Sequence, residues 1–141
     1  MEGAGRWHAT PYGDTLRWIT GEEETGGAYS MHERIAPPGS RSTPHSHSKL
    51  IESFYVLEGE FAFEIGGEPR DGSPGSFVSA VLGIEHAWRV LGDVPARALV
   101  LFAPSVKLAY FEELDGLVRS APGGHPDGAQ LLDLMRRYDW L

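Results

Sequence analysis

The sequence predicts an all-β barrel or sandwich followed by a short helical tail, and three observations support this fold class. Short segments rich in β-branched and aromatic residues recur through the middle of the chain, and glycine turns separate them. After Pro104 the apolar residues change to helical spacing. Regular short strands joined by tight turns are typical of barrels and sandwiches rather than of α/β folds.

The strands are expected in the middle of the chain, where apolar runs and turn signals follow one another. One of them alternates cleanly, with Phe61, Phe63 and Ile65 on one face and polar or small residues on the other. The expected strands cover residues 16–20, 28–35, 52–58, 60–65, 76–80, 85–90 and 96–102.

Two amphipathic helices are expected after the last strand. Leu108, Phe111 and Leu114 recur at helical spacing in the first, and the run SAPGGHP at residues 120–126 ends it. The apolar stripe of the second consists of Leu131, Leu132, Met135 and Tyr138. We expect both helices to cover one end of the barrel or a neighbouring subunit, since most amphipathic helices are half buried.

The length of 141 residues predicts one domain. It would comprise an N-terminal arm with the first strand (1–27), a barrel (28–104) and a helical tail (105–141). The formal net charge of -8 argues against nucleic acid and anionic membranes as partners, because both require a positive surface. No apolar run has the length of a signal peptide or a membrane span, which predicts a cytoplasmic location.

The segment PHSHSKLIE, residues 44–52, carries a candidate metal site. In a strand, His45 and His47 would project from one face, and a hairpin over residues 48–51 would return Glu52 beside them. A fourth ligand must come from a distant strand, and His86 is the candidate. The chain has no cysteine, so any metal must be held by imidazole and carboxylate groups. Such a spacing, flanked by Gly39 and Gly59, has odds by chance on the order of one in a thousand.

These residues resemble two motifs of the cupin superfamily. The run GSRSTPHSHSKLIESFYVLEG, residues 39–59, has every fixed position of the first motif. The run GSFVSAVLGIEHAWRV, residues 75–90, is similar to the second and departs from it at Val81 and Val90. The resemblance implies a double-stranded β-helix, also called a jelly-roll or cupin barrel. It also implies one divalent transition metal inside this barrel, bound by His45, His47, Glu52 and His86.

Three imidazoles and one carboxylate suit Fe, Mn, Ni, Co, Cu or Zn rather than calcium or magnesium. Four protein ligands leave positions open at the ion, as catalysis requires. We therefore expect a metal-dependent enzyme, with dioxygenase-type oxidation of a small organic molecule, aromatic molecules included, as the leading reaction. The resemblance also implies that Glu52 is the candidate for proton transfer. An isomerase, epimerase or cyclase, or a non-catalytic ligand-binding cupin, are the alternatives.

Several further residues carry weaker predictions. Phe54 and Trp88 share strand faces with Glu52 and His86, so they would either wall a substrate pocket or fill the core. Glu33 and Arg34 lie on opposite faces of one strand, so one of them points inward, and the register decides which.

The remaining expectations concern surfaces. The apolar Leu50 and Ile51 would form a lip of the site or a contact in a homodimer, which is the expected assembly. The other three histidines, His8, His32 and His125, have no ligand-like neighbours and are expected on the surface or in loops.

Overall fold

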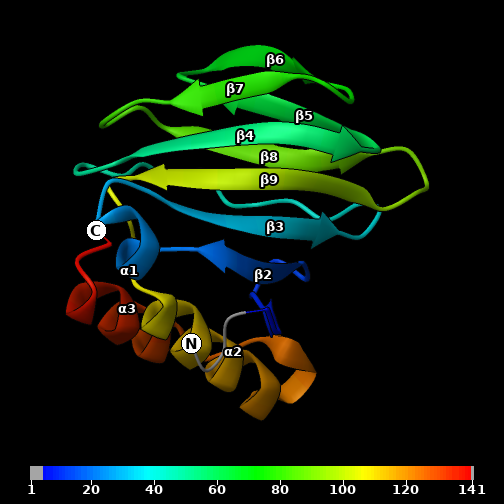
Figure 1. The fold of residues 1–141 in the computed structure, drawn as a ribbon. Helices are drawn as coiled ribbons and strands as arrows, with labels where there is room; N and C mark the ends of the chain where they lie inside the picture. The colour runs from blue at the N-terminus through cyan, green and yellow to red at the C-terminus, as the bar shows by residue number, and fades with distance from the viewer. Residues whose placement is uncertain (1–4, 141) are drawn as a thin grey trace.

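The computed structural model describes residues 5–140, so residues 1–4 of the expected arm and residue 141 of the expected tail lie outside the described residues. Two antiparallel sheets face each other (Figure 1). The larger sheet has the strand order β1 (Trp7–Ala9), β2 (Thr15–Thr20), β3 (Ser30–Ala36), β9 (Ala96–Ala103), β4 (Ile51–Glu58) and β7 (Phe77–Ala80). The smaller sheet has the order β6 (Glu68–Gly72), β5 (Glu60–Ile65) and β8 (His86–Leu91). The predicted all-β fold with a helical tail is confirmed.

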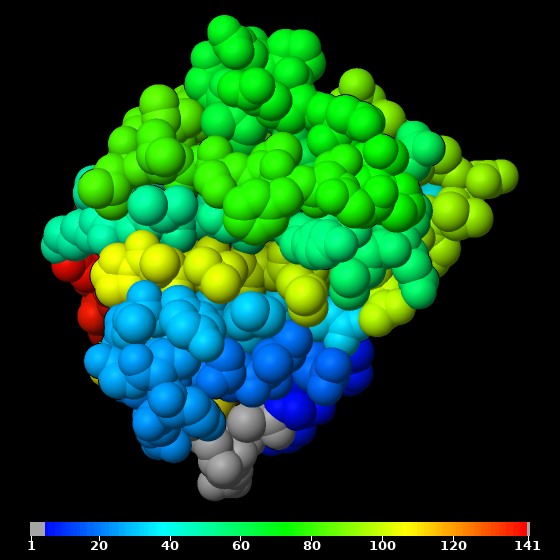
Figure 2. Space-filling model, turned by 45° about the horizontal axis from the view of Figure 1, so that its top comes forward, coloured from blue at the N-terminus to red at the C-terminus, as the bar shows by residue number. Residues whose placement is uncertain are grey.

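The outer face of the larger sheet shows how far apart in sequence its neighbours are. Strands β4, β9, β3 and β2 run as adjacent bands across the molecule, with β9 between two strands that precede it in the chain (Figure 2). Such long-range pairing brings the middle of the sequence and its last strand into one layer.

The apolar core lies between the two sheets. Phe54 of β4 packs against Phe63 of β5 with ring centroids 5.0 Å apart, and Trp88 of β8 contacts Phe61 at 5.9 Å. All four side chains are at most 2% exposed. Burying one large apolar side chain stabilises a fold by roughly 1.5–3 kcal/mol, so these contacts hold the sheets together.

The expected strands agree with the structure to within two residues at each end, whereas three short elements within residues 5–104 were not expected. These are β1, β6 and the short helix α1 (Glu22–Thr25). Strand β6 reads EPRDG, exposes every side chain before Gly72 and lies at the edge of its sheet. A strand without a buried face shows no alternation of apolar and polar residues in its sequence, and its proline is tolerated at a sheet edge. Only its hydrogen-bonded pairing with β5 identifies β6 as a strand.

The segment with the two neighbouring histidines does not form the expected hairpin. Residues 41–47 run antiparallel to β8 through two isolated bridges, Arg41 with Arg89 and His45 with His86. Glu52 belongs to β4, which pairs with β7 and β9 in the other sheet. Residues 48–51 therefore carry the chain from one sheet to the other, so Glu52 reaches the histidines across the interior.

Gly59 allows the chain to cross back. It stands between β4 in the larger sheet and β5 in the smaller one, with a φ of +70°. A Cβ atom at this position would lie 2.7 Å from both the Ala96 Cα and the Pro95 carbonyl oxygen. The turn thus requires glycine for its backbone angle and for the close approach of the neighbouring chain.

The helical tail packs against the barrel. It consists of α2 (Leu108–Ser120), a 3-10 turn η1 (Pro122–Gly124) and α3 (Gly128–Arg137), which lie beyond β2 in Figure 1. Phe111 of α2 contacts the rings of Trp18 at 5.9 Å and His32 at 5.3 Å. Both partners stand on the inner faces of β2 and β3, so α2 closes this side of the core. Among the described residues, no helix is both long and apolar enough to cross a membrane.

The buried face of α3 differs from the expected stripe by one position. Leu134 is fully buried, whereas Leu132 is 38% exposed. Leu131, Met135 and Tyr138 pack against the core as expected. Residues 131, 134, 135 and 138 follow the helical spacing i, i+3, i+4, i+7, so the inclusion of Leu132 was wrong and Leu134 belongs to the stripe.

Candidate metal centre

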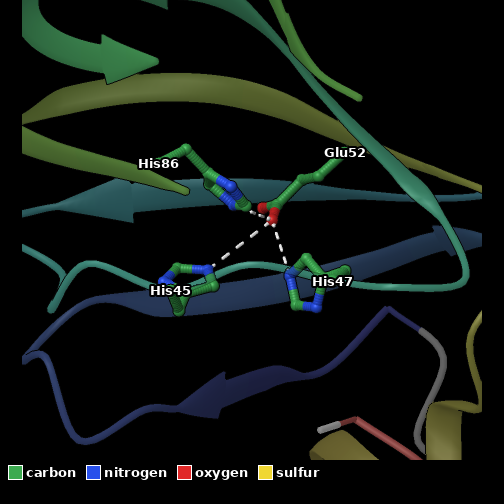
Figure 3. Close-up of side chains that lie close together, drawn as sticks. All are labelled: His45, His47, Glu52 and His86. Carbon is green, nitrogen blue, oxygen red and sulfur yellow. Dashed lines mark hydrogen bonds and ion pairs between the residues drawn. The ribbon is translucent and has the colours of Figure 1, made fainter. Parts of the chain in front are cut away.

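Four side chains from both sheets meet in the interior, and all four are the ones predicted as metal ligands (Figure 3). His45 and His47 come from the segment beside β8, and His86 is the first residue of β8. Glu52, the second residue of β4, faces them from the larger sheet. The backbone bridge between His45 and His86, with N···O distances of 3.0 and 2.8 Å, fixes two of these side chains relative to each other.

The ligand-type atoms of the four residues all lie within 4.8 Å of one another. The Nε2 atoms of His86 and His47 are 3.0 and 3.1 Å from Glu52 Oε1, and the Nε2 atom of His45 is 3.8 Å away. His47, Glu52 and His86 are buried, whereas His45 is partly exposed. The cluster thus opens to its surroundings on the side of His45.

The outer nitrogens of two rings determine what the inner nitrogens can do. The Nδ1 atoms of His45 and His86 lie 2.8 and 3.1 Å from the backbone carbonyls of Thr43 and Ile84. A carbonyl only accepts hydrogen bonds, so Nδ1 carries the proton, and in a neutral ring Nε2 is then an acceptor. The lone pairs of these Nε2 atoms and the carboxylate oxygens repel each other unless a cation lies between them. The four side chains therefore fit as ligands of a metal ion, and without the ion a proton shared between a nitrogen and an oxygen relieves the repulsion.

The charge state of Glu52 agrees with this assignment. Burial alone raises the pKa of this carboxyl, but the nearby His45 ring, the hydrogen bonds with His47 and His86 and the charge of Arg34 outweigh burial and hold the pKa well below its usual range. Conversely, burial lowers the pKa of His86, and the hydrogen bond and charge of Glu52 raise it to a net value above the ordinary one. The carboxylate is thus ionised and attracts a cation to the cluster.

A cavity of about 680 Å³ adjoins the cluster and reaches from the barrel to the helical tail. Trp88 lines it, whereas Phe54 does not and packs deeper in the core. Tail residues make up much of the wall, and no sequence pattern had indicated that they belong to the site. They are Tyr110, Phe111, Leu114, Leu131, Met135 and Trp140. The helical stripes had indicated burial of Phe111, Leu114, Leu131 and Met135, but neither their place beside a cavity nor the part played by Tyr110 and Trp140.

Trp140 joins the tail to the cluster. Its ring stacks on Tyr110 with centroids 4.5 Å apart and contacts the His47 ring at 4.9 Å. An ion pair between Lys49 and Asp139 fixes the same segment to the loop that follows the histidines. A molecule in the cavity would therefore lie between the candidate ligands and an aromatic wall.

The register of β3 settles which of its two charged residues points inward. Glu33 faces outward, where its carboxylate accepts hydrogen bonds from Arg17 and Arg97. Arg34 points inward and lines the cavity. His32 stands on the same inner face and is 1% exposed, so the expectation of a surface or loop histidine was wrong for this residue.

His8 is also buried, at 3% exposure, because it belongs to the unexpected strand β1. His125 is exposed as expected. Leu50 is partly buried and packs against the core. These differences arise because the inward face of a strand depends on its pairing, which the sequence alone does not reveal.

A barrel of two facing sheets with three histidines and a glutamate clustered inside it defines a class of metal-binding barrel proteins. Residues 31–102, just over half of the chain, match the family model described as "Cupin domain". The chain belongs to the cupin family, which confirms the resemblance of its two motifs.

Three further proteins are similar to this chain. Quercetin 2,3-dioxygenase of Bacillus subtilis (strain 168) is 29% identical over 79 residues, which are 55% of this chain and 23% of that protein. The chain thus matches less than a quarter of that enzyme's length. The structure of KdgF from Halomonas sp. has a TM-score of 0.64 at 24% identity and covers 70% of this chain and 86% of that one. A predicted oxalate decarboxylase from Thermotoga maritima has a TM-score of 0.64 at 20% identity, covering 73% and 94%. Both structural matches show the fold.

Proposed function

We propose that the protein is a metal-dependent enzyme that catalyses dioxygenase-type oxidation of a small organic molecule with an aromatic part. The observation that carries this proposal is the convergence of His45, His47, Glu52 and His86 beside a cavity with aromatic walls. The similarity to quercetin 2,3-dioxygenase favours this reaction over others that the same ligands would support. In a dioxygenation both atoms of O₂ enter the substrate, which is itself oxidised, so no external reductant is required.

The four side chains would hold one divalent transition metal: Fe, Mn, Ni, Co, Cu or Zn. When bound, such an ion supplies Lewis-acid or redox chemistry. The backbone carbonyls at Thr43 and Ile84 orient the rings of His45 and His86, so the acceptor nitrogens face inward before any ion binds. Preorganised ligands lose less conformational entropy on binding, which supports high affinity.

Glu52 is the residue best placed to move a proton. Its carboxylate is ionised, and it borders the cavity as well as the three histidines. A substrate hydroxyl or C–H group entering from the cavity would meet this carboxylate as its proton acceptor. The Trp140 and Tyr110 rings line the same cavity with apolar surface, and a substrate that fills it would displace water from the carboxylate.

Elemental analysis tests the metal part of the proposal. Protein purified without added metal should carry about one equivalent of a transition metal, and His47→Ala should lose most of it, because loss of one ligand lowers affinity steeply. His125→Ala is the matched control, because His125 is exposed and outside the cluster. Equal metal content in the parent and His47→Ala would contradict the assignment.

Oxygen uptake tests the reaction. With a panel of small aromatic molecules as trial substrates, flavonols and aromatic acids included, the loaded parent should consume O₂ and oxidise at least one of them, and Glu52→Gln should be impaired at matched metal content. Turnover that continues at full rate without oxygen, particularly with zinc as the native metal, would instead identify an isomerase, epimerase or cyclase. A ligand that stays unchanged over long incubation would identify a non-catalytic binding protein.

A further inference from the structure

The wall of the cavity contains a buried cation that the four-residue cluster does not use. Arg34 lies on the inner face of β3, opposite Ala98 of β9, and its side chain is only 8% exposed. It lines the same cavity as His45, His47 and Glu52. A charged guanidinium is rarely buried unless hydrogen-bond partners surround it, so the contacts that Arg34 makes or lacks indicate its role.

The protein holds this guanidinium in place but occupies little of its hydrogen-bonding capacity. Its Nε atom donates a hydrogen bond of 2.7 Å to Asp14 Oδ2, and Asp14 in turn accepts one from the Thr10 hydroxyl. The guanidinium carbon lies 4.8 Å from the Trp88 ring centroid and 5.9 Å from that of Phe54. A guanidinium has five N–H donors, yet Nη1 has no partner among residues 5–140. The side chain is therefore fixed, buried and incompletely satisfied.

The balance of charge near the cavity favours an anion. The charged residues in its lining are Arg34 and Glu52, and Asp14 stands directly behind the arginine. With a divalent ion at the cluster, the charges of these three side chains and the ion sum to about +1, since two carboxylates and one guanidinium offset one unit of the ion's charge. The walls are largely aromatic and aliphatic, so an anion would be poorly solvated there unless it met a donor.

We propose that Arg34 binds the carboxylate of the substrate and that the substrate is an aromatic monocarboxylate. The planar guanidinium matches a carboxylate in a two-point hydrogen-bonded contact. Asp14 and Trp88 act as positioning residues, because one bonds the guanidinium edge and the other stacks on its face. The proposal deepens the function proposed above and rests on it in one respect: the cavity beside the cluster is taken to be the substrate site.

Calorimetric titration with benzoate and its neutral analogue benzamide tests the proposal on metal-loaded protein. Benzoate should bind the parent more tightly than benzamide, and Arg34→Gln should weaken benzoate binding by about ten- to a hundredfold with benzamide unchanged, the effect of losing hydrogen bonds to a charged group. Arg17→Gln is the matched control, because Arg17 pairs with Glu33 on the outer face of the barrel. It should bind benzoate as the parent does.

Two additions keep the result interpretable. If Arg34→Gln leaves Asp14 unpaired and fails to fold, the double variant Asp14→Asn, Arg34→Gln removes both buried charges together and should show the same loss of benzoate binding. Metal content is measured on every sample, and the titration is repeated after chelation. Arg34-dependent benzoate binding by a protein without metal would support the anion site even if the metal proposal failed.

Three outcomes would overturn the proposal. They are equal benzoate affinity in the parent and Arg34→Gln, equal affinity of the parent for benzoate and benzamide, and no benzoate binding at millimolar concentrations. Each of these would leave a metal found at the cluster unaffected.

Discussion

His32 should make the protein measurably less stable in mild acid. Its ring lies between those of Phe102 and Phe111, with centroids 5.5 and 5.3 Å away, and it is 1% exposed. Neither ring nitrogen has a hydrogen-bond partner among residues 5–140. Burial, with a further contribution from the charge of Arg34, lowers the pKa of His32 to about 3, although Glu52 acts in the opposite direction.

The direction of the effect follows from the two pKa values. In the unfolded chain His32 has a pKa near 6.5, so below that pH the unfolded state takes up a proton that the folded state excludes until about pH 3. The free energy of unfolding therefore falls as the pH drops from 6.5 towards 3. At about 1.4 kcal/mol per pH unit below 6.5, the loss between pH 7 and pH 5 is about 2 kcal/mol.

Urea unfolding of the metal-free parent and His32→Leu, each at pH 7 and pH 5, measures this contribution. The leucine variant replaces the imidazole with an apolar side chain of similar size and so removes two unpaired nitrogens, and we expect it to be at least as stable as the parent at pH 7. The parent should lose about 2 kcal/mol more than the variant between the two pH values. Histidines common to both proteins cancel in this comparison. If parent and variant lost equal stability, the reasoning about His32 would be refuted.

Three further predictions concern packing, a turn and the cluster. Leu134→Ala should lower the free energy of unfolding by about 2–5 kcal/mol, because Leu134 is fully buried, whereas Leu132→Ala should cost less than about 1 kcal/mol in the same urea titration. Gly59→Ala should lower the free energy of unfolding by about 3 kcal/mol or more, because the backbone is left-handed there and a Cβ would meet residues 95–96. Gly83→Ala should lower it by only about 1 kcal/mol, because Gly83 has a φ of +78° but open space around it. Similar melting temperatures for the two variants would contradict this reasoning. Metal affinity, measured by competition with a chelator, should fall at least about tenfold between pH 7.5 and pH 5.5. The pKa of His86 is raised, so a proton competes with the metal for its nitrogen across that range. An affinity that does not change with pH would argue against histidine ligation.

The sequence revealed the candidate metal centre better than the path of the chain around it. His45, His47, Glu52 and His86 were identified because their types and spacing form a pattern that chance rarely produces. The route was wrong, since residues 41–47 pair with β8 and Glu52 arrives from the opposite sheet. Spacing constrains which residues can meet, but several strand pairings satisfy the same spacing.

The cavity was the least predictable feature, because it depends on two kinds of information that a single sequence lacks. The inward orientation of Arg34 depends on the register of β3 against β9, and a shift of one residue would have placed Glu33 there instead. Trp140 reaches the cluster only because the tail folds back over the barrel. Helical periodicity showed that α2 and α3 have a buried face, and tertiary packing decided that part of this face borders a hollow.

The contact between Trp140 and His47 joins two stretches of chain that are far apart in sequence, and each supplies a different part of the site. Of the residues that would hold an ion, Glu52 and His86 belong to strands and His45 is bridged to β8. Part of the wall around a guest molecule comes instead from a later segment, residues 110–140. Substitutions in that later segment can therefore reshape what is admitted while the coordinating atoms stay where they are. Proteins that evolve from such a barrel could therefore change their ligand specificity while the metal ligands stay the same.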